Sequence, residues 1–77
     1  MIFKVIVTPK VGVLDPQGKA IQQTLNSMGF SSVNEVRQGK YFNIDVNEKD
    51  EIKAKAKIDD MCKKLLANLV IEDYKII

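Results

Sequence analysis

Four short segments of the chain have the apolar pattern of β-strands. Residues 2–8, IFKVIVT, carry apolar residues on both faces, which predicts a central strand covered at least partly on both sides. Residues 41–46 alternate, so Phe42, Ile44 and Val46 are expected to point inward. The other two predicted strands are residues 33–38 and residues 70–77.

Two longer segments have the apolar spacing of helices. The first covers residues 16–28 and is followed by Gly29, a residue typical of helix C-caps. The second is expected to begin after Asn47 as N-cap and to end near Asn68 as a left-handed C-cap. The predicted apolar faces are Ile21, Leu25 and Met28 in the first helix, and Ile58, Met61, Cys62, Leu65, Leu66 and Leu69 in the second.

The element order is therefore β-α-β-β-α-β, with Gly39-Lys40 as a hairpin turn between the two middle strands. Right-handed crossovers place both helices on one face of the sheet. The predicted fold class is α+β: a ferredoxin-like two-layer sandwich with a four-stranded sheet and two helices on one face. Residues 1–77 form one domain, and the open sheet face, which includes Ile6 and Tyr41, is a candidate surface for self-association.

The segment VGVLDPQGKAI, residues 11–21, is close to a phosphate-binding loop. Its glycines are separated by five residues where the motif G-x-x-x-x-G-K-[ST] has four, and Ala20 stands where a hydroxyl should meet Mg²⁺. Asp15 is a good N-cap, and Pro16 fits the first helical position. The capping carboxylate occupies the positive helix end that a phosphate would use. The segment is predicted to be a capped helix start and not a phosphate-binding loop.

Composition narrows the classes of function. The 77 residues carry a net charge of +2, which is too small to indicate nucleic-acid or membrane binding. There is no histidine and only one cysteine, so histidine-dependent nucleophiles, imidazole metal sites and an internal disulfide are excluded. No catalytic, cofactor-binding or metal-binding residue is expected. The lone Cys62 and the absence of a signal pattern or apolar span predict a cytoplasmic protein, with Cys62 in the core.

Two further patterns favour a structural interpretation. Asp59-Asp60 and Glu72-Asp73 are adjacent pairs whose side chains diverge, so solvated charge is expected in place of a metal site. The segment RQGKYF, residues 37–42, partly matches the third strand of an RNA-recognition module. Tyr41 and Phe42 are adjacent and must face opposite sides, so at most one of them could stack on a base.

Three segments together resemble the PurS family, a subunit of phosphoribosylformylglycinamidine (FGAM) synthase. They are GVLDPQGKAI (residues 12–21), VRQGKYF (36–42) and VIEDY (70–74), and the likeness extends over essentially the whole chain. The last segment departs from the family pattern, because Leu69 stands where the family usually has proline.

The resemblance implies a non-catalytic subunit in de novo purine biosynthesis. It implies a homodimer or higher oligomer that joins a synthetase subunit, PurL, to a glutaminase subunit, PurQ, and supports the transfer of glutamine-derived ammonia. ATP, Mg²⁺ and glutamine would be used by those partners and not by this chain. Dimer and tetramer remain open at this stage.

We hypothesise that the strand-to-helix loop and a second patch contact partners, since Arg and Tyr are common interface anchors. The candidate interface residues are Leu14, Asp15, Gln17, Lys19, Arg37, Lys40 and Tyr41. The alternative for the first group is an ordinary exposed helix turn. Two other functions also stay open: a stand-alone ferredoxin-like regulatory domain that binds a small effector, and RNA binding.

Overall fold

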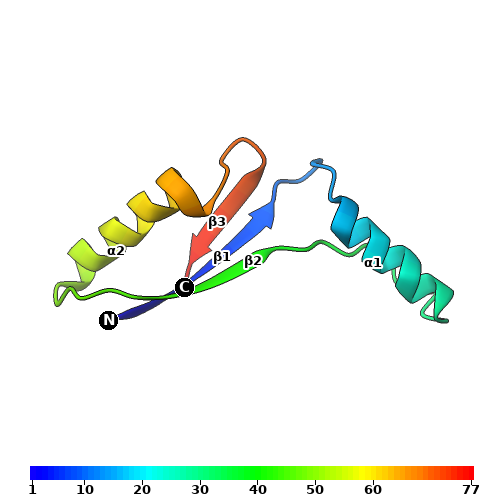
Figure 1. The fold of residues 1–77 in the computed structure, drawn as a ribbon, viewed down its shortest axis with the longest axis horizontal. Coiled ribbons are helices and arrows are strands. Elements are labelled where there is room, and N and C mark those ends of the chain that lie inside the picture. The colour runs from blue at the N-terminus through cyan, green and yellow to red at the C-terminus, as the bar shows by residue number, and fades with distance from the viewer.

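Strand β1 (Ile2–Pro9) is the centre of a three-stranded antiparallel sheet with the order β2-β1-β3 (Figure 1). The computed structural model describes all residues 1–77. The other elements are α1 (Pro16–Ser27), β2 (Lys40–Asp45), α2 (Glu51–Met61), a π-helical turn η1 (Cys62–Leu66) and β3 (Glu72–Ile76). The prediction of a central strand here is confirmed, but only one face of the strand is well covered, since Ile2 on the other face is 62% exposed.

One face of the sheet and helix α2 form the core. Val5 pairs with Phe42 on β2 and with Ile76 on β3, so these three side chains share the face that α2 covers. Along α2, Ala54 and Ile58 point into the same layer. The buried core consists of Phe3, Val5, Val7, Val46, Ala54, Ile58, Cys62 and Ala67.

Helix α1 lies away from this core and projects beyond one end of the sheet (Figure 1). The molecule measures 50 × 23 × 14 Å, and its radius of gyration is 16.0 Å. A compact domain of this length would have a radius of about 11 Å. We call α1 and residues 30–38, which return toward the sheet after a turn at residues 31–32, the arm. Its apolar residues are largely uncovered: Ile21 is 42% exposed and Met28 67%.

The predicted four-stranded ferredoxin-like sheet is wrong. Residues 33–38 form no strand, and the chain continues through Gly39 into β2 without turning back. A two-residue hairpin needs a positive φ at its first turn residue, and Gly39 does not have one. Because the chain runs straight here, α1 and residues 33–38 cannot fold onto this chain's own sheet.

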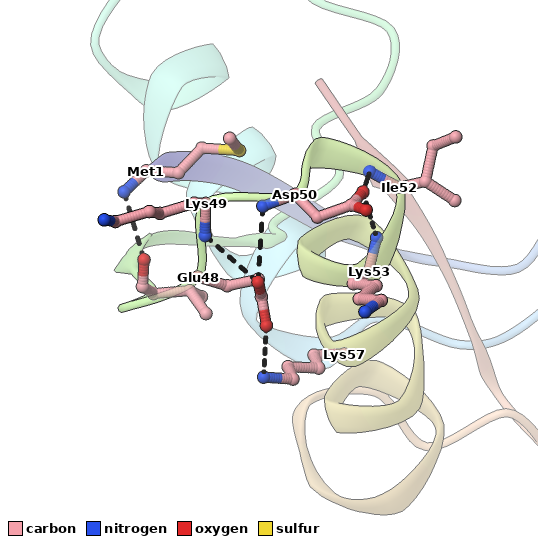
Figure 2. Close-up of polar contacts among 8 residues, drawn as sticks. Met1, Glu48, Lys49, Asp50, Ile52, Lys53 and Lys57 are labelled. Carbon is pink, nitrogen blue, oxygen red and sulfur yellow. Dashed lines mark hydrogen bonds and ion pairs between the residues drawn. The ribbon is translucent and has the colours of Figure 1, made fainter.

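The predicted ends of the second helix are also wrong. Asp50, not Asn47, is the N-cap, with its Oδ1 atom accepting from the backbone N–H groups of Ile52 (2.9 Å) and Lys53 (3.2 Å) (Figure 2). Asn68 is not left-handed, since no residue other than glycine has a positive φ. The helix passes into the π turn instead, and Ala67 N–H donates to the Cys62 carbonyl at 3.0 Å.

The π turn changes which side chains reach the core. A π turn holds more residues than an α turn, so the i, i+3, i+4 spacing no longer keeps one face inward. Ile58 and Cys62 are fully buried, but Leu65 is 83% exposed and Met61 38%. The prediction for the apolar stripe is confirmed for Ile58 and Cys62 and in part for Leu66, which packs against the core. It is wrong for the exposed members, Met61, Leu65 and Leu69. Burial raises the pKa of the Cys62 thiol, as expected for a core cysteine.

A polar cluster fixes the start of α2 (Figure 2). The Glu48 carboxylate accepts from the backbone N–H groups of Lys49 and Asp50 and from Lys57 Nζ, which lies 2.9 Å away. The Lys57 hydrogen bond is the main reason that the pKa of Glu48 is lowered. The Met1 ammonium donates to the Val46 carbonyl at 3.0 Å, so it ties β1 to the chain just before this cluster.

Tyr74 joins β3 to α2. Its hydroxyl donates to Asp59 Oδ1 at 2.5 Å. Asp59 also forms an ion pair with Lys63, whose Nζ atom lies 3.0 Å from Asp59 Oδ2. Asp59 stays partly exposed, as expected for solvated charge, and it also has a structural role. The hydrogen bond to Asp59 raises the pKa of Tyr74 to about 12.

No helix of the chain is long and apolar enough to span a membrane.

Ile58→Ala should lower the free energy of unfolding by about 2–5 kcal/mol, because it removes a fully buried side chain. Leu65→Ala, an exposed control in the π turn that follows α2, should change it by less than about 0.5 kcal/mol. Urea unfolding followed by circular dichroism measures both. Equal losses in the two variants would contradict the burial pattern that the π turn imposes.

The phenol of Tyr74 should ionise with a midpoint near pH 12 in the folded protein. Since its folded pKa lies above the unfolded value of about 10, the stabilisation is complete below pH 10 and is lost as pH rises through 12. The difference in phenolate absorbance between the wild type and Tyr74→Phe gives this midpoint. A midpoint near pH 10 while circular dichroism still reports a folded chain would mean that Tyr74 does not donate to Asp59.

Candidate functional site at the hinge of the arm

The hinge between the sheet and the arm contains the largest hollow of the molecule, about 380 Å³. It lies where β1 leaves the sheet, α1 begins and the return segment passes back toward β2. A second hollow of about 360 Å³ shares Gly12, Glu35 and Arg37 with it. The lining of the first is Gly12, Val13, Leu14, Asp15, Lys19, Gln22, Glu35, Val36 and Arg37.

Asp15 joins the two ends of the arm. Its Oδ1 atom accepts from Gly18 N–H at 3.0 Å, which caps α1 and confirms the predicted cap. Its Oδ2 atom accepts from Gln38 N–H at 2.7 Å. The hydrogen bonds from Gln38 and then Gly18 hold the pKa of Asp15 below its usual value. Each oxygen of the carboxylate therefore accepts one hydrogen bond from the chain's own backbone, and Asp15 holds the helix start as predicted.

Arg37 connects the arm to the end of β1. Its Nη2 atom donates to the Lys10 carbonyl at 3.0 Å, and its Nη1 atom lies 3.7 Å from Glu35 Oε1. Lys10 N–H in turn donates to the Ile71 carbonyl at 2.8 Å, just before β3. Arg37 therefore sets the direction in which the arm leaves the sheet.

Gly18 allows α1 to lie directly on the return segment. It is buried, and a Cβ atom at this position would lie 2.2 Å from the Val36 carbonyl oxygen. Asn26 Nδ2 at the other end of α1 donates to the carbonyls of Phe30 (3.0 Å) and Val33 (3.2 Å). The arm is therefore a helix and an extended strand-like segment joined at both ends.

The structure brings together part of the predicted interface. Leu14, Asp15, Lys19 and Arg37 all line the hinge hollow. Gln17 lies on the exposed first turn of α1, outside the hollow. Lys40 and Tyr41 belong to β2, where Lys40 Nζ lies 3.8 Å from Glu72 Oε2 and Tyr41 is 57% exposed. The prediction that these residues contact partners stays a prediction.

Sequence reasoning missed Glu35, Gln38 and the carbonyl of Lys10 as parts of this site. Their roles depend on backbone groups and on the angle of the arm, for which the sequence carries no local signal. No three Cys, Asp or Glu side chains of the chain are grouped so that they could hold a metal ion. The groups at the hinge can hold a partner by charge, hydrogen bonds and apolar contact.

Known proteins of similar sequence and structure agree with this arrangement. Residues 2–77 match the family model "PurS: Phosphoribosylformylglycinamidine (FGAM) synthase". The PurS subunit of Methanocaldococcus jannaschii is 49% identical over 72 residues, which cover 94% of this chain and 87% of that protein. The solved structure of Bacillus subtilis PurS has a TM-score of 0.88 and 46% identity, covering 99% of this chain and 94% of that one.

A chain of the PurLQS structure from Thermotoga maritima has a TM-score of 0.86 and 29% identity, with 100% of this chain and 96% of that chain covered. This chain belongs to the PurS family of FGAM synthase. A TM-score of 0.88 over 99% of an elongated chain requires a similar placement of arm and sheet. The projecting arm is therefore shared with Bacillus subtilis PurS.

Gly18→Ala should loosen the arm, because the added methyl group must displace the Val36 carbonyl or the Asp15 carboxylate. Such overpacking typically costs about 1–3 kcal/mol. We expect the amide proton of Gln38, bonded to Asp15, to exchange with solvent faster in this variant. Gln17→Ala, one residue earlier on the exposed side, is the control and should leave that exchange unchanged.

Proposed function

We propose that this chain is the small subunit of an FGAM synthase and joins the synthetase subunit PurL to the glutaminase subunit PurQ. The observation that carries the proposal is the family match over residues 2–77, which includes the whole hinge. A chain of similar fold occurs in the PurLQS structure of Thermotoga maritima. In this role the chain supports transfer of glutamine-derived ammonia, and the enzyme acts in the cytoplasm.

The chemistry of the hinge supports a binding role. Both oxygens of the Asp15 carboxylate accept hydrogen bonds from backbone N–H groups, whereas Arg37 donates one hydrogen bond to a backbone carbonyl and keeps other N–H donors for a partner. We assign ATP, Mg²⁺ and glutamine to the partner subunits. The exposed Leu14 beside the hollow offers a partner an apolar contact, and the Lys19 ammonium makes no ion pair within the chain. We further propose that the subunit works as a homodimer, since the arm leaves its apolar side uncovered.

The test is a rate comparison in a mixture of PurL and PurQ, with and without this chain. Glutamine-driven FGAM synthesis should require the chain, whereas synthesis from free ammonia should largely not require it. If the chain changes neither rate, the coupling role is wrong. A rise in melting temperature with small effectors would then favour the regulatory-domain alternative.

In the same assay, alanine at both Arg37 and Tyr41 should lower the glutamine-driven rate about fivefold or more at limiting subunit concentration. This corresponds to losing an interface anchor worth more than about 1 kcal/mol. Lys55→Ala, an exposed change on α2, is the control and should act like the wild type. Unchanged rates in the double variant would exclude Arg37 and Tyr41 from the working interface.

A further inference from the structure

The two hollows at the hinge form one groove. They share Gly12, Glu35 and Arg37, so they are continuous with each other. The groove begins beside Thr8 near the end of β1 and reaches Gln22 on α1, at the place where the arm leaves the sheet (Figure 1). Because it is open to solvent, it suits a segment of polypeptide chain better than a small molecule, whose binding depends on enclosure.

The charged side chains of the groove leave one cation without a partner. Asp15 accepts two backbone hydrogen bonds, and Glu35 lies 3.7 Å from Arg37. The Lys19 ammonium makes neither an ion pair nor a hydrogen bond within the chain. Arg37 keeps N–H donors beyond the one that bonds the Lys10 carbonyl. A carboxylate is the group that both cations bind by charge-assisted hydrogen bonds, so the groove is short of one acidic group.

Each part of the groove also has an exposed apolar side chain. Leu14 lines the first hollow and is 75% exposed, and Val11 lines the second and is fully exposed. Arg37 belongs to both hollows, so the charged groups lie where the two meet. Protein interfaces commonly combine apolar contacts with an arginine in this way. The groove therefore matches a segment in which apolar side chains stand on either side of an acidic residue.

We propose that the hinge groove binds an extended acidic segment of another subunit of the enzyme, in which apolar side chains flank an aspartate or glutamate. The carboxylate contacts Lys19 and Arg37, and the flanking side chains cover Leu14 and Val11. The contact leaves the hydrogen bonds of Asp15 in place, so the arm keeps its position. The proposal rests on the coupling role assigned above and specifies the chemistry by which a partner recognises this chain.

Carbodiimide cross-linking tests the contact in a mixture of this chain with PurL and PurQ. The reagent joins a lysine amine to a carboxylate that touches it, and it takes up the water that the new amide bond releases. We expect an amide bond between Lys19 Nζ and an aspartate or glutamate of PurL or PurQ, located by mass spectrometry. Lys53, an exposed lysine on α2 that also makes no ion pair, is the matched control and should form none.

Charge substitutions test the same contact without a reagent. Lys19→Glu should weaken binding of the chain to PurL and PurQ about tenfold or more, because a carboxylate then faces a carboxylate, whereas Lys53→Glu, with the same change of charge, should keep the affinity within about twofold. Lys19→Arg should bind like the wild type but lose the cross-link, since it keeps the charge and lacks the amine. Titration calorimetry gives the affinities.

A Lys19 cross-link only to this chain or to a second copy, or equal losses of affinity in the two glutamate variants, would overturn the proposal. So would a higher melting temperature of the chain alone in glutamate than in chloride at equal ionic strength, which would assign the groove to a small carboxylate. A glutamine-driven rate that depends on the chain without this cross-link would refute the groove contact but not the coupling role. A cross-link without coupling would refute only the latter.

Discussion

At Gly39 the chain passes from the arm into β2 while its backbone lies against the carbonyl of Val7. A Cβ atom at Gly39 would lie 2.5 Å from that oxygen, so the close approach depends on glycine. Gly39 has no positive φ and the chain does not turn back here, so the two segments on either side point in opposite directions. Every large feature of the molecule follows from this: the three-stranded sheet, the projecting arm, the free edge of β2 and the uncovered face of α1.

The hydrogen bonds at the hinge fix the position of the arm relative to the sheet. Asp15 holds the first turn of α1 to Gln38, and Arg37 holds the return segment to the carbonyl of Lys10. Both contacts use backbone partners, whose positions vary less than those of long side chains. A subunit that joins other proteins benefits from such an arrangement, since ordering a surface before binding reduces the entropy lost in the complex.

The two halves of the molecule are stabilised differently. In the sheet and α2, apolar burial around Val5, Val7 and Ile58 dominates, with the hydrogen bond from Tyr74 to Asp59 fixing the helix to β3. The arm has few buried side chains and depends on capping and polar links, with Gly18 allowing helix and segment to touch. A chain divided in this way is expected to gain stability from association, as short domains often do.

The sequence by itself determined the elements whose signals are local. The strand at residues 2–8, the Asp15-Pro16 helix start and the inward positions of Phe42, Ile44 and Val46 follow from side-chain periodicity and capping, which act within a few residues. Only the tertiary structure decided whether residues 33–38 turn back at Gly39, and which part of the stripe from Ile58 to Leu69 is buried. A hairpin and a straight passage suit the same alternating pattern, and a π turn leaves no mark in it. The choice depends on which distant surfaces the chain can reach, so the hinge with Glu35, Gln38 and the Lys10 carbonyl emerges only from the folded chain.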